Sequence, residues 1–343
     1  MNTTLIKRAI IHEIDEIMNF IDKEWKKNHI LSKNKELFEY DFREEELLNF
    51  IIAKSPNNQI LGLIGYIKSN TSNHPDIWAS IWKVSSLNKY PLLGLYLLNY
   101  LRKKIHYRHF IVSGISKNTI DIYKGLGIQT GILKQAYILN PCKKKFEIAK
   151  INNSKIRGER ESHLSKTNYY IEEIKDYEIL ESYLNSINLK SCIPYKDFNY
   201  FQKRFLQHPI FIYQYYGIFS NKCISALIVC RVVTYCDSKC IRIVDYYGKH
   251  DKIVFAKPYL LNLLIEYNYE YIDFLQYGFN NDILLSAGFR FLDYEKDDII
   301  IPNYFAPFIR KNRAINFAAD LDQSESFTIF KADGDQDRPN LIL

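Results

Sequence analysis

The order of apolar and polar residues along this chain predicts alternating strands and helices. Segments rich in β-branched and aromatic residues, bounded by Asn, Ser or Gly, are typical of strands. These predicted strands are Ile60–Tyr66, Ile77–Val84 and Phe110–Val112 in the first half, and Cys223–Val233, Cys240–Tyr247 and Tyr271–Leu275 in the second. The run Leu92–Lys103 is apolar nearly all round, so we expect a helix that is buried against a sheet rather than amphipathic.

The predicted elements occur twice. The segment Tyr96–Leu101 recurs almost identically as Tyr259–Leu264, and each copy is followed by a polar break and then a strand. A short helix that ends in glycine comes next, at Gly127 in the first copy and at Gly288 in the second. Such an internal repeat indicates two structural units of one kind. We expect an α/β (α+β) fold of two tandem lobes, each a mixed, mostly antiparallel sheet flanked by helices.

A polar stretch rich in Lys, Asn and Ser separates the two copies and predicts a linker. We expect a first lobe at 1–145, a linker at 146–165 and a second lobe with its tail at 166–343. The length of 343 residues suits two domains, and 47% hydrophobic with 25% charged residues is typical of a folded protein.

The charge and the cysteines exclude several classes of protein. Lys and Arg outnumber Asp and Glu by 46 to 39, and this mild surplus would help to attract an anionic ligand such as a nucleotide or coenzyme A. It falls short of the basic stripe of a nucleic-acid-binding protein, so we expect no nucleic-acid partner. The six cysteines form no CxxC motif and have no His at zinc-finger spacing, so we expect no metal.

The chain is expected to be cytoplasmic and to have no membrane partner. No segment contains the roughly 20 uninterrupted apolar residues that span a bilayer. Met1–Ile11 lacks the apolar core and the cleavage site of a signal peptide.

The segment before the apolar helix carries a candidate phosphate-binding motif, Lys89-Tyr90-Pro91-Leu92-Leu93-Gly94-Leu95. It resembles the Q/R-x-x-G-x-G/A loop of GNAT acyltransferases, whose backbone amides hold the pyrophosphate of coenzyme A. Gly94 matches the motif, whereas Lys89 stands where Gln or Arg is usual and Leu95 replaces the last small residue. A helix N-terminus binds phosphate because it presents unpaired N–H groups and the positive end of the dipole. A buried helix that starts with proline is an equally good interpretation of the isolated segment.

The corresponding segment of the second half, Ala256–Tyr259, has no glycine, so we expect the first lobe to bind acyl-coenzyme A. The GNAT pattern N-x-x-x-x-x-Y-x-x-x-G-F is matched, one residue short, by Asn118, Tyr123 and Gly127. The resemblance implies that Tyr123 is the general acid for the departing thiolate; a core tyrosine is the alternative. It also implies that a backbone N–H near the end of strand Ile77–Val84 polarises the thioester carbonyl. The residues implied at acyl-coenzyme A are Trp82, Lys83, Val84, Lys89, Tyr90, Leu92, Leu93, Gly94, Asn118 and Tyr123.

Three further segments, Phe20–Leu31, Ile301–Phe305 and Phe330–Asn340, together resemble a narrower group. These are two-lobed GNAT sugar N-acyltransferases that act on dTDP-linked amino sugars for surface polysaccharide such as O-antigen. The resemblance covers nearly all of the chain. It implies direct attack by the amine of a nucleotide-linked amino-dideoxy sugar on acyl-coenzyme A. It also implies that the second lobe with its tail binds the nucleotide sugar; we expect a monomer or a weak dimer.

His29 follows a helix that contains Trp25, at the position where GNAT folds border the acceptor site. Histidine titrates near neutrality and is therefore a candidate base, although a lone histidine is more often structural. Asp245 interrupts an apolar strand, and burying an unpaired carboxylate is costly. It either binds the substrate or forms an ion pair with Arg242 or Arg231. The catalytic candidates are thus His29, Tyr123 and Asp245.

The C-terminal tail resembles a calcium loop only superficially, because it lacks the Glu at the twelfth position, and we reject an EF-hand. We expect a fixed tail that lines the cleft, with Arg338 available for a diphosphate. Tyr246 and Tyr247 should face opposite sides of their strand. The candidate substrate-binding residues are Trp25, His29, Asp245, Tyr246, Tyr247, Asp335, Asp337, Arg338 and Asn340.

Two other functions remain open. A Fem-type aminoacyl ligase also has two GNAT lobes and uses aminoacyl-tRNA, but it usually carries a coiled-coil arm and stronger basic patches. A tandem GNAT fold without catalytic activity, acting as a binding module, is the second alternative, because the match to the phosphate-binding motif is incomplete.

Overall fold

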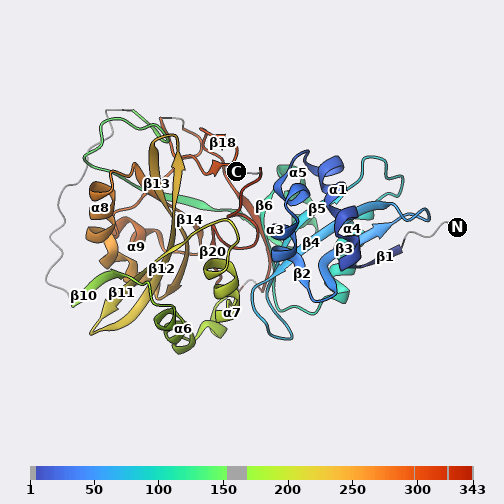
Figure 1. The fold of residues 1–343 in the computed structure, drawn as a ribbon, viewed down its shortest axis with the longest axis horizontal. Helices are drawn as coiled ribbons and strands as arrows, with labels where there is room; N and C mark the ends of the chain where they lie inside the picture. The colour runs from blue at the N-terminus through green and yellow to red at the C-terminus, as the bar shows by residue number, and fades with distance from the viewer. Residues whose placement is uncertain (1–4, 153–167, 297, 323, 342–343) are drawn as a thin grey trace. The chain divides into compact units, whose positions relative to one another are not determined.

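The computed structural model describes residues 5–152, 168–296, 298–322 and 324–341. These residues form two compact units, drawn in Figure 1. Unit 1 comprises Met1–Thr130, Phe317–Gln323 and Gly334–Leu343, and unit 2 comprises Gly131–Asn316 and Ser324–Asp333. The predicted fold class is confirmed, because each unit contains a mixed sheet flanked by helices.

The sheet of unit 1 follows the order β1-β3-β4-β5-β6-β19-β7, with β2 paired to β3. Its strands are β1 (Leu5–Ile10), β2 (Arg43–Glu44), β3 (Leu47–Lys54), β4 (Ile60–Lys68), β5 (Ile77–Val84), β6 (Phe110–Ile115), β7 (Gln129–Ile132) and β19 (Asn316–Asp320). Strands β1, β3, β4 and β5 pair antiparallel, and β5 pairs parallel to β6. The crossover between β5 and β6 contains α4 (Leu93–Lys104), as a parallel pair requires.

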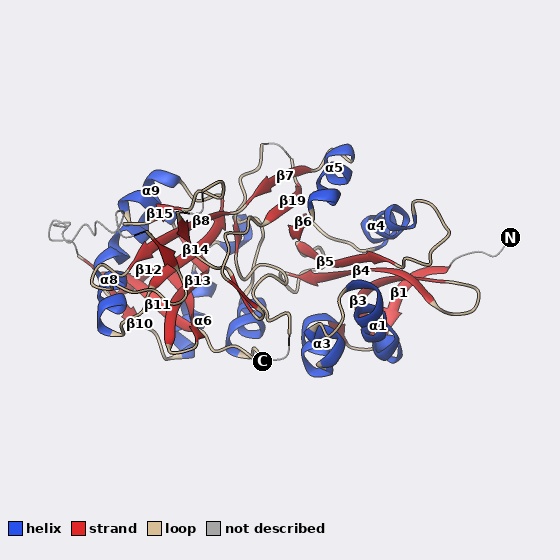
Figure 2. Cartoon of the chain, turned by 90° about the horizontal axis from the view of Figure 1, so that it is seen from above, coloured by secondary structure: helices blue, strands red, loops and turns tan. Residues whose placement is uncertain are grey.

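Helices cover both faces of the unit 1 sheet (Figure 2). Helices α1 (Ile14–Phe20), α2 (Ile30–Lys33) and α3 (Lys35–Phe42) precede β2, and α5 (Lys117–Gly125) follows β6. Figure 2 shows α1 and α3 on the face opposite to α4. The four buried leucines of α4 and Tyr123 of α5 share one core with side chains of β5 and β6.

Helix α4 differs from the expectation that it is buried all round. Leu93, Leu97, Leu98 and Leu101 are at most 3% exposed, but Tyr96 is 55% exposed. The three basic residues at the end of the helix also face solvent, so α4 is amphipathic. The prediction was wrong because an outward apolar side chain such as Tyr96 is common on protein surfaces and does not imply burial.

Unit 2 repeats this arrangement with the sheet order β10-β11-β12-β13-β14-β8-β15, and β20 pairs with β14. Its strands are β8 (Lys134–Leu139), β10 (Tyr169–Glu173), β11 (Gln214–Ser220), β12 (Cys223–Tyr235), β13 (Ser238–Gly248), β14 (Tyr271–Tyr277), β15 (Arg290–Phe291) and β20 (Ile329–Phe330). Its helices are α6 (Tyr177–Ser186), α7 (Phe198–Phe201), α8 (Lys257–Glu266) and α9 (Asn281–Ser286). Two short pairs, β9 (Lys150–Ile151) with β16 (Ile299–Ile300) and β17 (Tyr304–Phe305) with β18 (Phe308–Ile309), complete it.

The units differ from the predicted boundaries at two places. Strand β8, expected in the first lobe, pairs with β14 in the sheet of unit 2, where both of its faces are buried. Conversely, residues 334–343, expected with the second lobe, belong to unit 1. Part of the predicted linker is packed rather than free, because the buried carboxylate of Glu270 accepts hydrogen bonds from the N–H groups of Ile148 and Ala149. Residues 153–165 of that linker lie outside the described residues.

Candidate functional site

Strands β5 and β6 of unit 1 pair over a short distance and then separate. Their parallel register runs only from Ile77 opposite Phe110 to Ala79 opposite Val112. Directly after Ala79 the register of β5 with β4 shifts, so that Ser80 and Ile81 both stand opposite Gly65. Such a bulge bends its strand. The last residues of β5, Trp82–Val84, therefore stay paired to β4 without pairing to β6.

Helix α4 begins beside this open strand end with uncapped amides. The first N–H groups of any α-helix lack acceptors within the helix, and no side chain caps them in α4. The indole Nε1 of Trp82 donates to the carbonyl oxygen of Gly94 at 3.2 Å, which fixes the end of β5 against the first turn. Tyr90 and Leu92, in front of the helix, are exposed, as is Lys89. An uncapped helix start of this kind suits a phosphate group, and that α4 binds the diphosphate of coenzyme A remains a prediction.

Leu92, the residue that precedes α4, has a backbone conformation that favours glycine. Leu92 has a φ of 62°, in the left-handed region that glycine occupies at little cost. Counted from Lys89, the first glycine of the Q/R-x-x-G-x-G/A motif falls on Leu92 and the second on Gly94, so the assignment of Leu95 to the last small residue of the motif was wrong. An ideal Cβ on Gly94 would lie 3.4 Å from Nε1 of Trp82, which is ordinary contact.

Replacing Leu92 by glycine is expected to stabilise unit 1 by about 1 kcal/mol, because a left-handed non-glycine residue costs roughly 1–2 kcal/mol. The side chain is 63% exposed, so little packing is lost. The measurement is the free energy of unfolding in urea. Leu87→Gly is the control, since Leu87 is exposed and lies outside the left-handed region, and its replacement should destabilise slightly. A destabilised Leu92→Gly variant would contradict the expectation.

The structure brings Tyr123 close to Trp82. The Tyr123 side chain is 1% exposed and its ring centroid lies 5.8 Å from that of Trp82. Burial raises the pKa of Tyr123 above its ordinary value, so its hydroxyl stays protonated at neutral pH. Asn118 is exposed in the first turn of the same helix. A protonated hydroxyl beside the open end of β5 suits an acid rather than a base, and the role of Tyr123 remains a prediction.

The C-terminal tail lies across the same strands of unit 1. The Ser80 hydroxyl donates to Asp335 at 2.6 Å, and Gln336 Nε2 donates to the Ser113 carbonyl oxygen at 3.0 Å. The tail also approaches Trp78, since an ideal Cβ on Gly334 would lie 3.0 Å from the Trp78 Cβ. The expectation of a fixed tail is therefore met within unit 1.

The charged residues of the tail are paired within unit 1. Arg338 donates to Asp335 at 3.0 Å and to Asp41 at 3.3 Å, and its side chain is 4% exposed. Asp337 is fully buried. That Arg338 binds a diphosphate remains a prediction, but the carboxylates of its own chain already neutralise its charge.

His29 has a structural setting. Its Nδ1 accepts a hydrogen bond from the Leu31 N–H at 3.2 Å, and its Nε2 lies 3.3 Å from Oδ1 of Asn340. Burial, together with the positive charge of Arg338, lowers the pKa of His29 to about 3. The half-exposed Trp25 stands edge-on to the imidazole, with 4.6 Å between ring centroids. The role of His29 as a base remains a prediction; the geometry favours a neutral imidazole that caps α2 and holds the tail.

Asp245 of unit 2 is fully buried and paired. Lys196 Nζ donates to its two oxygens at 2.6 and 2.8 Å and to Asp333 at 3.1 Å. The Tyr247 hydroxyl also donates to Asp245, at 3.0 Å. An ion pair was the alternative interpretation of Asp245, but the expected cation was wrong: Lys196 lies 49 residues away in the sequence, and no local pattern indicates it. Tyr246 packs in a different core from Tyr247, in agreement with the predicted alternation.

Asp333 gives unit 2 a testable dependence on pH. Burial raises the pKa of Asp333 from 3.8 to about 6. The positive charge of Lys196 lowers this pKa, whereas the negative charge of Asp245 raises it further. A raised folded-state pKa contributes stability that is complete below the unfolded value and is lost as the pH rises through the folded value. We expect the unfolding free energy of the unaltered chain, relative to Asp333→Asn, to fall between pH 3.8 and about 6. Urea unfolding across this range measures it, with the exposed Asp121→Asn as control; a constant difference would contradict the expectation.

The corresponding strand ends of unit 2 are filled by the chain itself. Strands β13 and β14 pair parallel only from Ile241 to Ile243, after which Val244 forms a bulge against β12. Here β20 pairs with β14, and the Ala332 N–H donates to the Val244 carbonyl oxygen at 2.9 Å. A 3₁₀ turn runs directly into α8, and Pro258 in its first turn has no N–H. The Lys257 N–H donates to the Val254 carbonyl oxygen, so the first two positions of α8 offer no free N–H, although no side chain caps this helix either.

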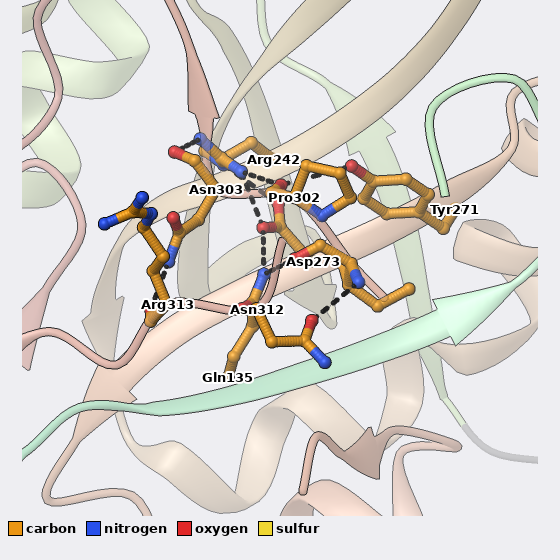
Figure 3. A network of polar contacts seen from close by, with 9 residues as sticks. Gln135, Arg242, Tyr271, Asp273, Pro302, Asn303, Asn312 and Arg313 are labelled. Atoms are coloured by element: carbon orange, nitrogen blue, oxygen red, sulfur yellow. Dashed lines mark hydrogen bonds and ion pairs between the residues drawn. The ribbon is translucent and has the colours of Figure 1, made fainter. Parts of the chain in front are cut away.

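A second buried ion pair in unit 2 is structural (Figure 3). Arg242 donates twice to Asp273, at 3.0 and 2.8 Å, and also to the carbonyl oxygens of Pro302 and Asn303. Gln135 of β8 donates to the same carboxylate at 2.9 Å. These contacts hold the segment after β16 and strand β8 onto the sheet of unit 2, with both charges fully desolvated.

Several residues of this geometry were not found from the sequence: Ser80, Ser113 and Gln336 in unit 1, and Lys196 in unit 2. The available signal was weak, because Ser80 and Ser113 are small polar residues within mostly apolar strands. Among the described residues, no group of His, Cys, Asp and Glu side chains is arranged to hold a metal ion. No helix in the described part of the chain has the length and apolar character needed to cross a membrane.

Comparisons with known proteins identify the fold. No protein-family model and no curated protein matches the chain. A GCN5-related N-acetyltransferase from Anabaena variabilis ATCC 29413 superimposes with a TM-score of 0.56 at 10% identity, over 92% of this chain and 72% of that chain. A conserved protein of Enterococcus faecalis V583, described as a "probable N-acyltransferase", superimposes with a TM-score of 0.54 at 9% identity, over 94% and 73%. At these identities the likeness shows the fold.

Proposed function

We propose that this chain, which has the fold of GCN5-related N-acetyltransferases, transfers an acyl group from acyl-coenzyme A to an amine, and that unit 1 binds the coenzyme. One observation carries the proposal: the uncapped start of α4 stands beside the end of β5 that does not pair with β6. The corresponding strand ends of unit 2 are occupied by β20 and its helix start is blocked. The acyl-coenzyme A site is therefore assigned to unit 1 alone.

The residues of unit 1 fit the two ends of acyl-coenzyme A. The amides of Leu93 and Gly94, at the positive end of the α4 dipole, bind the diphosphate. Beyond Ala79, β5 does not pair with β6, so its backbone is able to bind the extended arm of the coenzyme. A backbone N–H near Trp82 then polarises the thioester carbonyl, as a hydrogen-bond donor aimed at a developing oxyanion does.

The chemistry is formation of an amide. The nitrogen of the neutral amine attacks the thioester carbon and gives up a proton to water, so a C–N bond forms and the C–S bond breaks. Tyr123 supplies a proton to the departing sulfur and regains one from solvent. A thiolate is a moderate leaving group, so this proton assists the reaction without being essential.

A nucleotide-linked amino-dideoxy sugar is the acceptor that we propose, for a step in the synthesis of surface polysaccharide. The support is the sequence resemblance of Phe20–Leu31, Ile301–Phe305 and Phe330–Asn340 to two-lobed sugar N-acyltransferases. Two of these segments contact each other in unit 1. His29, which directly precedes α2, belongs to the first segment, and Asn340 of the tail belongs to the third; Nε2 of His29 lies 3.3 Å from Oδ1 of Asn340.

The test is release of coenzyme A from acetyl-coenzyme A in the presence of dTDP-linked amino sugars. Tyr123→Phe should lower kcat by roughly 10- to 100-fold and leave both KM values unchanged. A general acid usually contributes about 100-fold or more, and a smaller effect is expected here because the thiolate leaves without full protonation. Tyr267→Phe, at an exposed position in unit 2, is the control. An unchanged kcat for Tyr123→Phe would remove Tyr123 from the chemistry. Absence of release with every amino sugar, with transfer from aminoacyl-tRNA instead, would replace the proposal by the Fem-type function.

A further inference from the structure

A buried hydroxyl without a partner lies where β6 separates from β5. Ser113 is 8% exposed, and its Oγ has no hydrogen-bond partner among the described residues. Phe110 and Val112 of β6 face the core shared with α4 and α5, so Ser113 faces the other side of the sheet. Buried polar groups are nearly always paired, and an exception of this kind requires an explanation.

The side chain of Gln336 links Asp335 of the tail to Ser113. The Nε2 atom of Gln336 is 3.1 Å from Oδ1 of Asp335 and 3.0 Å from the Ser113 carbonyl oxygen, so one amide group joins the two residues. Ser80 and Arg338 both donate to the other oxygen, Oδ2. Among these contacts, Oδ1 accepts a hydrogen bond from Gln336 alone. An ionised carboxylate oxygen accepts more than one hydrogen bond, so Oδ1 has room for a second donor.

The charges around Asp335 favour a cation. Arg338 divides its positive charge between Asp335 and Asp41, and the other two side chains that donate to Asp335, Ser80 and Gln336, are neutral. Burial opposes ionisation, but Arg338 and Ser80 hold the pKa of Asp335 below its ordinary value. Asp335 is therefore charged at neutral pH, and 11% of its side chain stays exposed to a ligand.

We propose that Oδ1 of Asp335 and Oγ of Ser113 bind the acceptor amine in its ammonium form, which makes unit 1 selective for cationic primary amines over hydroxyl counterparts. This inference rests on the proposed acyl transfer. The ammonium group offers three N–H donors, and two of them satisfy the free acceptor sites of Asp335 and Ser113. The ammonium loses one proton to water before its nitrogen attacks the thioester, and the nitrogen gives up a second proton to water as the amide forms.

The same contacts explain how the product leaves. Transfer converts the ammonium into an amide, which carries no charge and has fewer N–H donors. The attraction of Asp335 is lost at that moment, because a hydrogen bond to a charged group contributes more than one to a neutral group. Asp335 thus holds the substrate more tightly than the product.

The experiment measures steady-state kinetics with acetyl-coenzyme A and a dTDP-linked amino-dideoxy sugar as probes. Asp335→Asn should raise the KM for the amino sugar roughly 10- to 100-fold, the usual range for a charge-assisted hydrogen bond, and leave the KM for acetyl-coenzyme A unchanged. Ser113→Ala should raise the same KM by about 3- to 10-fold without lowering the melting temperature, because the deleted hydroxyl has no partner in the protein. Asp15→Asn, which removes an exposed ion pair with Lys35, is the control.

The outcomes distinguish this inference from the proposed function. Turnover in the unaltered chain with an unchanged amine KM in both variants would overturn the inference and leave the acyl transfer intact. If Asp335→Asn does not fold, Ser113→Ala decides. If no turnover is found, calorimetry compares the amino sugar with the same sugar carrying OH in place of the amine. Tighter binding of the amine that is lost in Ser113→Ala supports the inference, and equal binding of the two sugars overturns it.

Discussion

Gly94→Glu is expected to weaken the binding of acetyl-coenzyme A by about 100-fold or more while the protein stays folded. The new carboxylate stands in the first turn of α4, where it repels the diphosphate and competes for the free amides. Loss of two charge-assisted hydrogen bonds corresponds to at least about 3 kcal/mol. The helix itself gains up to about 1 kcal/mol, because an acidic residue near an N-terminus is favourable. Isothermal titration gives the affinity and urea unfolding gives the stability.

The matched control places the same charge in the first turn of another helix. Tyr177 is 57% exposed at the start of α6 in unit 2, so Tyr177→Glu should leave the affinity for acetyl-coenzyme A unchanged. A Gly94→Glu variant that binds acetyl-coenzyme A as the unaltered chain does would remove α4 from the coenzyme site.

Arg338→Met is expected to destabilise the fold by about 3–5 kcal/mol, the cost of breaking a buried ion pair from one side. Asp335 and Asp41 would be left as buried carboxylates without their guanidinium. Methionine fills much of the arginine volume, so the loss reports on charge rather than on packing. The measurement is the unfolding free energy in urea at neutral pH.

Arg102→Met is the comparison, since Arg102 forms a half-exposed ion pair with Asp320 in the same unit. A pair of this exposure contributes at most about 1 kcal/mol. Equal effects of the two substitutions would show that the tail is not held in unit 1 by buried charge.

Much of the fold could be predicted from the sequence because it is encoded locally. The strand Ile77–Val84 was placed at its observed bounds, and α4 begins one residue later than expected, at Leu93. These elements follow from hydrophobic patterning and from Pro91, which are properties of neighbouring residues. The family resemblance implied that Tyr123 and Trp82 serve one ligand, and their ring centroids lie 5.8 Å apart in the structure; their contact with the coenzyme remains a prediction.

The long-range contacts could not be predicted in the same way. Lys196 pairs with Asp245 across 49 residues, and Ser80 pairs with Asp335 across 255. Nothing in a local pattern tells which buried charge finds which partner, or that β8 joins the sheet of unit 2. The left-handed Leu92 was also missed, because leucine does not mark such a position as glycine does.

The binding of acetyl-coenzyme A by unit 1, and by unit 1 alone, is tested most directly by calorimetric titration of the full chain. A single site per chain is expected, because the helix start and the strand ends of unit 2 are blocked by Pro258 and β20. Absence of binding, or a stoichiometry of two coenzymes per chain, would contradict the assignment of the site to α4.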